Sequence, residues 1–199
     1  YPEKDASYLV IDAYQHGSYV KVIPEKNMVI GYATNNHGGV PENFRNWFVV
    51  VSDTPFETFS VIDGDNVAEG NEVAADHALA MVGFRTRRGQ EVNLKVASSF
   101  ISAEQAELNL RELDGKSFDD VKTACRDRWN EVLGRIAVKD DNIDRLRTFY
   151  SCLYRSVLFP RKFYEINAEG KTVHYSPYNG QICEGYLYTD TGFWDTFRA

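Results

Sequence analysis

The sequence predicts an α+β fold, with an antiparallel β-sandwich in the first half of the chain and helices after it. Up to about residue 110 the hydrophobic runs are short and bounded by Gly, Asn and Pro, which is typical of strands joined by tight turns. From Phe118 onward the hydrophobic residues recur at helical spacing instead. The expected strands are Tyr8–Ile11, Tyr19–Ile23, Met28–Tyr32, Trp47–Val51 and Phe56–Ile62.

The clearest hairpin pattern lies over residues 79–97. Leu79–Arg85 and Glu91–Ala97 flank a turn at Thr86–Gly89, which predicts that the two runs pair with each other. Apolar and polar residues alternate at period two in the second run, so we expect its apolar side to pack and its polar side to face water. The apolar residues are Val92, Leu94 and Val96, and the polar ones are Glu91, Asn93 and Lys95.

Two amphipathic helices are predicted in the second half. Residues 118–136 carry apolar side chains on one side only, which predicts a linker helix. A second helix is expected to begin after a cap at Asp140 or Asp141 and to end before Pro160. The stretch that follows is expected to be irregular, with turns at Asn167–Gly170 and Pro177–Gly180, and residues 188–199 have the pattern of a loop that leads into a helix.

The composition and charge of the chain argue against several classes of function. The net charge of −7, with both signs interleaved, offers no basic surface for nucleic acid. No apolar run is long enough to span a bilayer, and the start at Tyr1 lacks both Met and a signal peptide, so we expect that an upstream segment has been removed. Three widely spaced cysteines favour neither a disulfide framework nor a zinc site. The 12 Tyr, 12 Phe and 3 Trp suit sugar-binding surfaces, although packing in sheets and in the core is the better explanation for them.

Few residues carry recognisable chemistry. Trp194, Asp195 and Arg198 combine a stacking ring, a hydroxyl acceptor and a positive charge, which are the groups that recognise sugars. The alternative is structural: Trp194 in the core, Asp190 or Asp195 as a helix cap, and Arg198 in an ion pair. The four histidines have no metal-binding spacing. The acidic strings 63–65 and 140–142 lack the spacing of a calcium loop, so we interpret them as a hairpin turn and a helix cap.

Two long segments resemble a known family. Residues 149–165, FYSCLYRSVLFPRKFYE, followed by residues 188–199, YTDTGFWDTFRA, are similar to the start of the catalytic domain of glycoside hydrolase family 92, the bacterial exo-acting α-mannosidases. Residues 43–48, NFRNWF, and 96–106, VASSFISAEQA, resemble the N-terminal sandwich domain of the same family. The resemblance extends over most of the chain from about residue 44.

The resemblance implies a specific architecture. Residues 1–112 would be the sandwich, which lacks a glycine-rich segment of the family and so would be incomplete; residues 113–140 would be the linker helix. Residues 141–199 would be the truncated start of an (α/α)6 toroid. In the family, a pocket between the two domains holds a terminal mannose, and hydrolysis is calcium-dependent and inverts the anomeric carbon, which requires a carboxylic acid and a carboxylate base.

The resemblance also assigns roles to residues. Asp195 would accept hydrogen bonds from mannose hydroxyls and Trp194 would shape the pocket wall, while Asp190 and Arg198 belong to the same motif. The acid, the base and the calcium ligands lie downstream in the family, so this chain alone is expected to be inactive and to bind no metal. Mannose-containing glycans, including N-glycans, are the expected partners, and the periplasm, the cell surface or the medium is the expected location.

Two other functions fit the sequence. The aromatic-rich sandwich could be a non-catalytic carbohydrate-binding module, because no pair of catalytic carboxylates can be assigned within the chain. A different glycosidase family with the same sandwich-plus-toroid architecture would keep the fold and change the sugar. Linkage preference and oligomeric state stay open.

Overall fold

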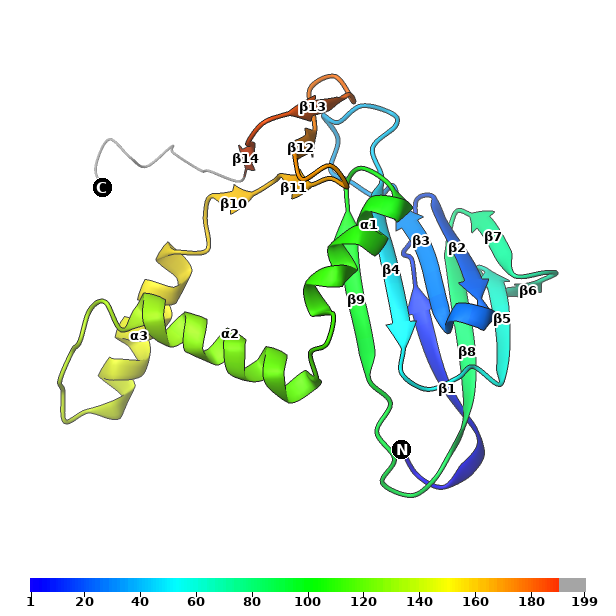
Figure 1. Ribbon diagram of the computed structural model, residues 1–199, viewed down its shortest axis with the longest axis horizontal. Helices are drawn as coiled ribbons and strands as arrows, with labels where there is room; N and C mark the ends of the chain where they lie inside the picture. Colours follow the sequence, from blue (N-terminus) through cyan, green and yellow to red (C-terminus); the bar gives the residue numbers. More distant parts are fainter. Residues whose placement is uncertain (190–199) are drawn as a thin grey trace. The chain divides into compact units, whose positions relative to one another are not determined.

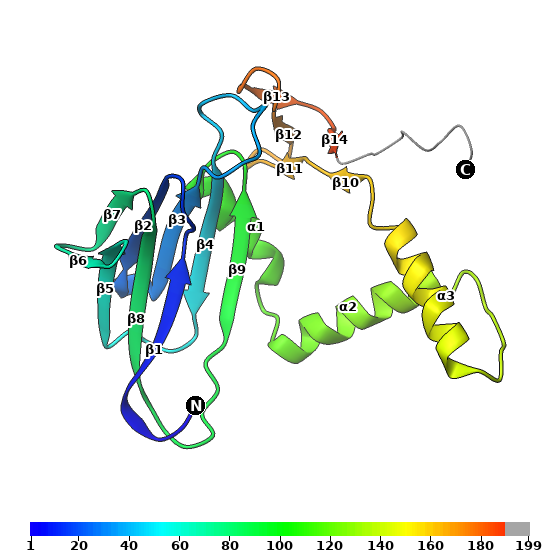
Figure 2. The ribbon, with the colours of Figure 1, turned by 180° about the vertical axis from the view of Figure 1, so that it is seen from behind.

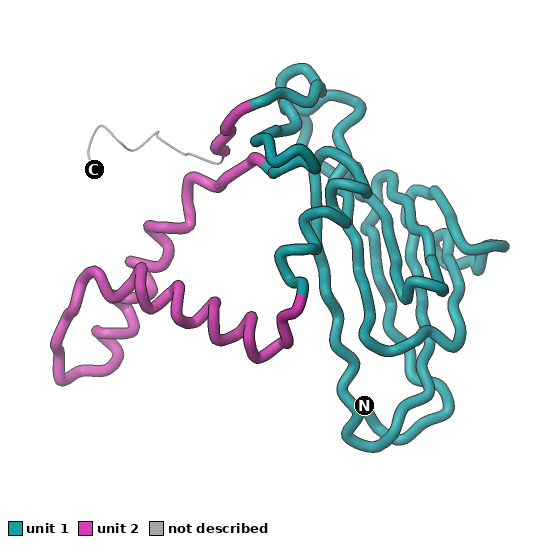
Figure 3. Tube along the Cα trace, viewed as in Figure 1, with its two compact units in different colours: residues 1–114, 165–184 teal, residues 115–164, 185–199 magenta. Residues whose placement is uncertain are grey.

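The computed structural model describes residues 1–189, and the chain divides into two compact units (Figure 3). Unit 1 comprises residues 1–114 and 165–184. Unit 2 comprises residues 115–164 and, among the described residues, 185–189. The fold class is the predicted one, an antiparallel β-sandwich followed by helices. The predicted domain limits at residues 112 and 140 stay a prediction.

Unit 1 is built on two antiparallel sheets (Figures 1 and 2). The five-stranded sheet has the order β7 (Glu72–Ala75), β2 (Ser18–Ile23), β3 (Met28–Ala33), β4 (Asn46–Ser52) and β9 (Leu94–Ser99). The four-stranded sheet has the order β1 (Lys4–Asp12), β8 (Ala78–Thr86), β5 (Thr58–Asp63) and β6 (Asn66–Ala68). A 3-10 turn, η1 (Pro24–Lys26), connects β2 to β3.

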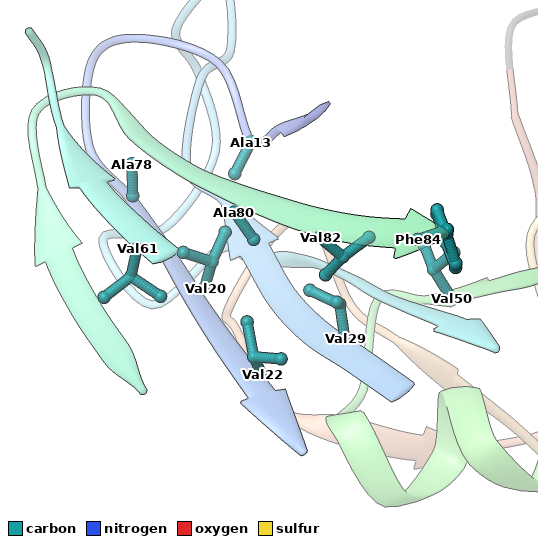
Figure 4. Packing of buried hydrophobic residues seen from close by; sticks show 10 residues of the cluster. All are labelled: Ala13, Val20, Val22, Val29, Val50, Val61, Ala78, Ala80, Val82 and Phe84. Atoms are coloured by element: carbon teal, nitrogen blue, oxygen red, sulfur yellow. The ribbon is translucent and has the colours of Figure 1, made fainter. Parts of the chain in front are cut away.

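The main core lies between these two sheets. Alternate residues of each strand point inward, as in β2, where Ser18, Val20 and Val22 are buried and the residues between them are not. β-branched side chains suit this pleated surface because their restricted rotamers pack closely. Figure 4 shows the cluster, which comprises Ala13, Val20, Val22, Val29, Val50, Val61, Ala78, Ala80, Val82 and Phe84.

A short helix covers part of the outer face of the five-stranded sheet. α1 (Ala103–Leu110) begins after Ser102, whose side chain accepts a hydrogen bond from the N–H of Gln105, and runs into η2 (Arg111–Leu113). Ala106 packs there against Met28 and Val49. The sequence did not predict this helix, because two turns are too short to show a helical period.

The predicted hairpin over residues 79–97 is wrong. β8 and β9 form, but β8 pairs with β1 on one edge and β5 on the other, whereas β9 pairs with β4 in the opposite sheet. Because both edges of β8 are occupied, the segment after Thr86 must cross to the other sheet.

The predicted exposure of β9 is also wrong. Leu94 and Val96 are 38% and 56% exposed, while Lys95 and Ala97 are partly buried. The register pairs Val96 with the inward-facing Val50, so the alternation is correct, but β9 is an edge strand and its inner face is incompletely covered. α1 packs on its other face instead, where Lys95 Nζ donates to the carbonyl of Leu113 at 2.9 Å.

A small sheet replaces most of the irregular stretch expected after Pro160. Its strands are β11 (Glu165–Ile166), β12 (Thr172–Tyr175) and β13 (Ile182–Glu184), all antiparallel and all part of unit 1. Strands of two to four residues carry no readable period, so the sequence missed them. The turns predicted at Asn167–Gly170 and Pro177–Gly180 are confirmed, as they join these strands. The turn at 63–65 is confirmed between β5 and β6.

Unit 2 contains the two predicted helices, α2 (Phe118–Leu133) and α3 (Ile143–Ser156). None of their side chains is buried, although Trp129 packs against Tyr154 with ring centroids 4.7 Å apart. The cap predicted at Asp140 or Asp141 is wrong: Asn142 caps α3 by accepting hydrogen bonds from the N–H groups of residues 144 and 145. Asp140 instead accepts the N–H of Asn142, which shifts the helix start past both aspartates.

Candidate functional site

The four predicted mannose contacts, Asp190, Trp194, Asp195 and Arg198, lie outside the described residues 1–189. Their roles therefore stay predictions. The structure does describe the strand that leads to them, β14 (Tyr188–Thr189), together with what holds it.

β14 joins the two segments that carry the most specific resemblance. It pairs antiparallel with β10 (Arg161–Lys162), which aligns Arg161 with Thr189 and Lys162 with Tyr188. Next to this ladder the N–H of Phe163 donates to the carbonyl of Leu187 at 2.8 Å. Residues about 27 positions apart thus meet within unit 2, and the start of the predicted sugar-binding motif is tied to the end of the α3 segment.

Three tyrosines cluster at this ladder. Tyr164 lies edge-to-face against Tyr186, at 4.8 Å between centroids and 89°, and against Tyr188, at 5.8 Å and 75°. Tyr186 and Tyr188 are 67% and 53% exposed in this chain. Exposed phenol rings offer both an apolar face and a hydroxyl, which are the groups that contact sugars. The sequence analysis missed this cluster, although the spacing of two between Tyr186 and Tyr188 on an extended segment predicts one shared face.

A second aromatic row crosses the outer face of the five-stranded sheet in unit 1. Tyr19, Tyr32 and Trp47 are direct cross-strand neighbours on β2, β3 and β4. Tyr19 stacks on Tyr32 at 5.4 Å, and Tyr32 meets Trp47 edge-on at 4.8 Å. The three rings pack against one another, so the row is mainly cross-strand packing and gives little support to a sugar-stacking platform.

Charged side chains contact the tyrosines of this row. The guanidinium of Arg45 lies 5.1 Å from the centroid of Tyr32, within range of a cation–π interaction. The hydroxyl of Tyr19 donates to Glu72 at 2.6 Å, and Glu72 also pairs with Lys21 at 3.0 Å. Burial of the phenol and its bond to Glu72 raise the pKa of Tyr19, while the Tyr19 and Lys21 bonds lower the pKa of Glu72. The carboxylate and the neutral phenol therefore form one fixed pair.

The described residues hold no assembled metal centre. Within residues 1–189 no group of three or more His, Cys, Asp or Glu side chains is placed to hold a metal ion. His77 instead pairs with Asp12 at 2.8 Å. No helix in this part of the chain is long and apolar enough to cross a membrane.

Comparison with protein families assigns the two halves of the chain to two domains of one family. Residues 1–99 match the glycosyl hydrolase family 92 N-terminal domain, and residues 105–199 match the glycosyl hydrolase family 92 catalytic domain. The chain belongs to glycoside hydrolase family 92. The resemblance in the sequence is therefore confirmed, including the order of a sandwich domain followed by a catalytic domain.

Solved structures of family 92 share the fold. A family 92 inverting mannosidase from Bacteroides thetaiotaomicron is 44% identical, with a TM-score of 0.93 over 100% of this chain. A family 92 α-mannosidase from the same organism, solved with mannoimidazole, is 24% identical with a TM-score of 0.85 over 100% of this chain. This chain covers 27% of each of these two proteins.

A curated relative matches over a shorter stretch. It is an uncharacterized secreted glycosidase from Arthroderma benhamiae, 35% identical over an alignment of 77 residues that covers 36% of this chain and 10% of the relative. The chain thus spans about a quarter or less of the proteins that it resembles.

Proposed function

We propose that this chain is the domain junction of an exo-acting α-mannosidase that removes terminal α-linked mannose from glycans with inversion at the anomeric carbon. The observation that carries the proposal is the 44% identity to an inverting mannosidase over the whole chain. The family assignment of both halves supports it.

Inversion needs two carboxyl groups about 6.5–9.5 Å apart, one to protonate the leaving oxygen and one to activate water on the opposite face of the sugar. We assign neither role within residues 1–199, and place both downstream, as the family resemblance implies. The proposed part of this chain is substrate binding: Asp195 accepts mannose hydroxyls, Trp194 forms pocket wall, and Asp190 and Arg198 complete the motif. Calcium, when bound by the full-length protein, supplies a hard cation for oxygen ligands.

The remaining parts of the proposal follow from the same family. The chain alone is inactive, because acid and base are supplied from elsewhere. The secreted relative from Arthroderma benhamiae supports a location outside the cytoplasm, in the periplasm, on the cell surface or in the medium.

The test is Asp195→Ala in the full-length protein. A charge-assisted hydrogen bond contributes about 1.5–3 kcal/mol, so kcat/KM should fall by about one to two orders of magnitude for each hydroxyl bonded, while the melting temperature changes little. If Asp195 only caps a helix, the change should instead cost about 0.5–2 kcal/mol of stability with kinetics near wild type. The second result would refute the binding role of Asp195.

A further inference from the structure

The carboxylate of Glu165 ties β11 to the sandwich. Its Oε1 accepts hydrogen bonds from the Ser99 hydroxyl and from the N–H of Phe100, both at 3.0 Å. Its Oε2 accepts from Asn109 Nδ2 at 2.6 Å. Glu165 is separated from these partners by 56–66 residues, so one side chain links β11 to the end of β9 and to α1.

The side-chain amide of Asn109, which donates to Glu165, is held in one orientation. Asn109 Nδ2 also donates to the carbonyl of Ser98 at 2.9 Å, and Asn109 Oδ1 accepts from Gln105 Nε2 at 2.9 Å. Gln105 Nε2 donates in addition to the carbonyl of Ile166 at 2.8 Å. Because these bonds fix the orientation of the Asn109 amide, residue 165 must accept on both oxygens, and a carboxylate does so while an amide cannot.

A second contact holds the other end of the small sheet. Asn43 Nδ2 donates to the carbonyl of Gly180 at 2.9 Å, and the hydroxyl of Tyr175 donates to Asn43 Oδ1 at 3.1 Å. Phe44 packs against both Phe100 and Tyr175, with centroids 5.6 and 5.9 Å apart. Tyr175 is 3% exposed, so its ring is buried in this contact.

These contacts cross the family's domain boundary. Residues 105–199 match the catalytic domain, yet residues 165–184 belong to unit 1 together with the sandwich. The chain leaves that anchored sheet at Glu184, and the predicted mannose-binding motif begins within the next six residues.

We propose that Glu165 is a positioning residue, whose carboxylate fastens segment 165–184 to the sandwich and thereby fixes the point from which the mannose-binding segment leaves it. The proposal rests on the proposed function and adds a residue outside the predicted motif. Its chemical basis is that the side chain of residue 165 must accept hydrogen bonds on both of its oxygens. Misplacement of substrate-binding groups by about 1 Å can reduce a rate by about 100-fold.

The test is Glu165→Gln in the full-length protein. In either amide orientation the new NH2 group meets a donor, the Phe100 N–H or Asn109 Nδ2. We expect KM for an aryl α-mannoside to rise about tenfold or more, with a smaller change in kcat, because bonds to sugar hydroxyls act in the ground state and the transition state alike. Hydrogen exchange over residues 172–184 should increase at the same time.

A matched control isolates the cause. The matched control is Glu184→Gln, which removes an exposed carboxylate paired with Lys171 on the same sheet at 2.8 Å and should leave KM unchanged.

The outcomes are distinguishable. An inactive wild-type protein contradicts the proposed function. An active wild type whose Glu165→Gln variant keeps KM and kcat, with exchange raised or not, overturns the positioning role alone.

Discussion

Gly180 provides the sharpest test of how the small sheet is held in unit 1. Its φ is +72°, and a Cβ added there would overlap Asn43 Oδ1. Gly180→Ala should therefore impose two costs. The left-handed backbone costs about 1–2 kcal/mol for a residue with a Cβ, and displacement of Asn43 breaks its bonds to Gly180 and Tyr175, each worth about 0.5–1.5 kcal/mol.

Gly170→Ala is the matched control. Gly170 has φ +76° and also closes a turn of the same sheet, but an added Cβ would have nothing within 4 Å. Gly170→Ala should therefore lose only the stability that the left-handed backbone costs. Gly180→Ala should be less stable than Gly170→Ala by about 1–3 kcal/mol in urea unfolding, because it also loses the two hydrogen bonds of Asn43. Asn43→Ala should make Gly180→Ala less costly, because it removes the overlap. Equal losses in the two glycine variants would refute this reasoning.

Two further predictions concern acid stability and the isolated chain. Asp53 accepts hydrogen bonds from the side chain and N–H of Asn93 and from Thr54; burial raises its pKa, but these bonds outweigh burial and leave the pKa below its ordinary value. A carboxyl group whose pKa is lowered in the folded protein stabilises the fold at pH values above its unfolded pKa of about 4. The difference in unfolding free energy between wild type and Asp53→Asn should therefore be largest at pH 7 and should shrink below about pH 4. A difference that does not change between pH 2 and pH 7 would contradict this prediction. Residues 1–199 alone should release no product from an aryl α-mannoside, and release that copurifies with this chain would show that acid and base lie within it.

Local sequence signals predicted the elements whose partners are close in sequence. The turns at Asn167–Gly170 and Pro177–Gly180 depend on residues within the turn, and the helix that begins at Phe118 depends on its own period of 3.6. The helix cap was missed by one residue, because Asp140, Asp141 and Asn142 are all good caps and only the backbone decides among them.

Pairing across the molecule could not be predicted in the same way. The alternation in residues 91–97 is correct, yet which sheet β9 joins depends on both edges of β8 being occupied by β1 and β5. Glu165 gave no local signal at all, since its three donors come from residues 99, 100 and 109. The predicted mannose contacts came from family resemblance, and the approach of Tyr164 to Tyr186 and Tyr188 followed only from the pairing of β10 with β14.

The most direct test of the central claim is the set of sugars released by the full-length protein from a panel of disaccharides. The panel contains α-1,2-, α-1,3- and α-1,6-mannobiosides, a β-mannobioside and an α-glucobioside, each incubated with and without a calcium chelator. The account predicts mannose from one or more α-mannobiosides, none from the β-mannobioside, no glucose, and loss of activity with the chelator that added calcium restores. Release of glucose, or of mannose from the β-linked substrate alone, would contradict it.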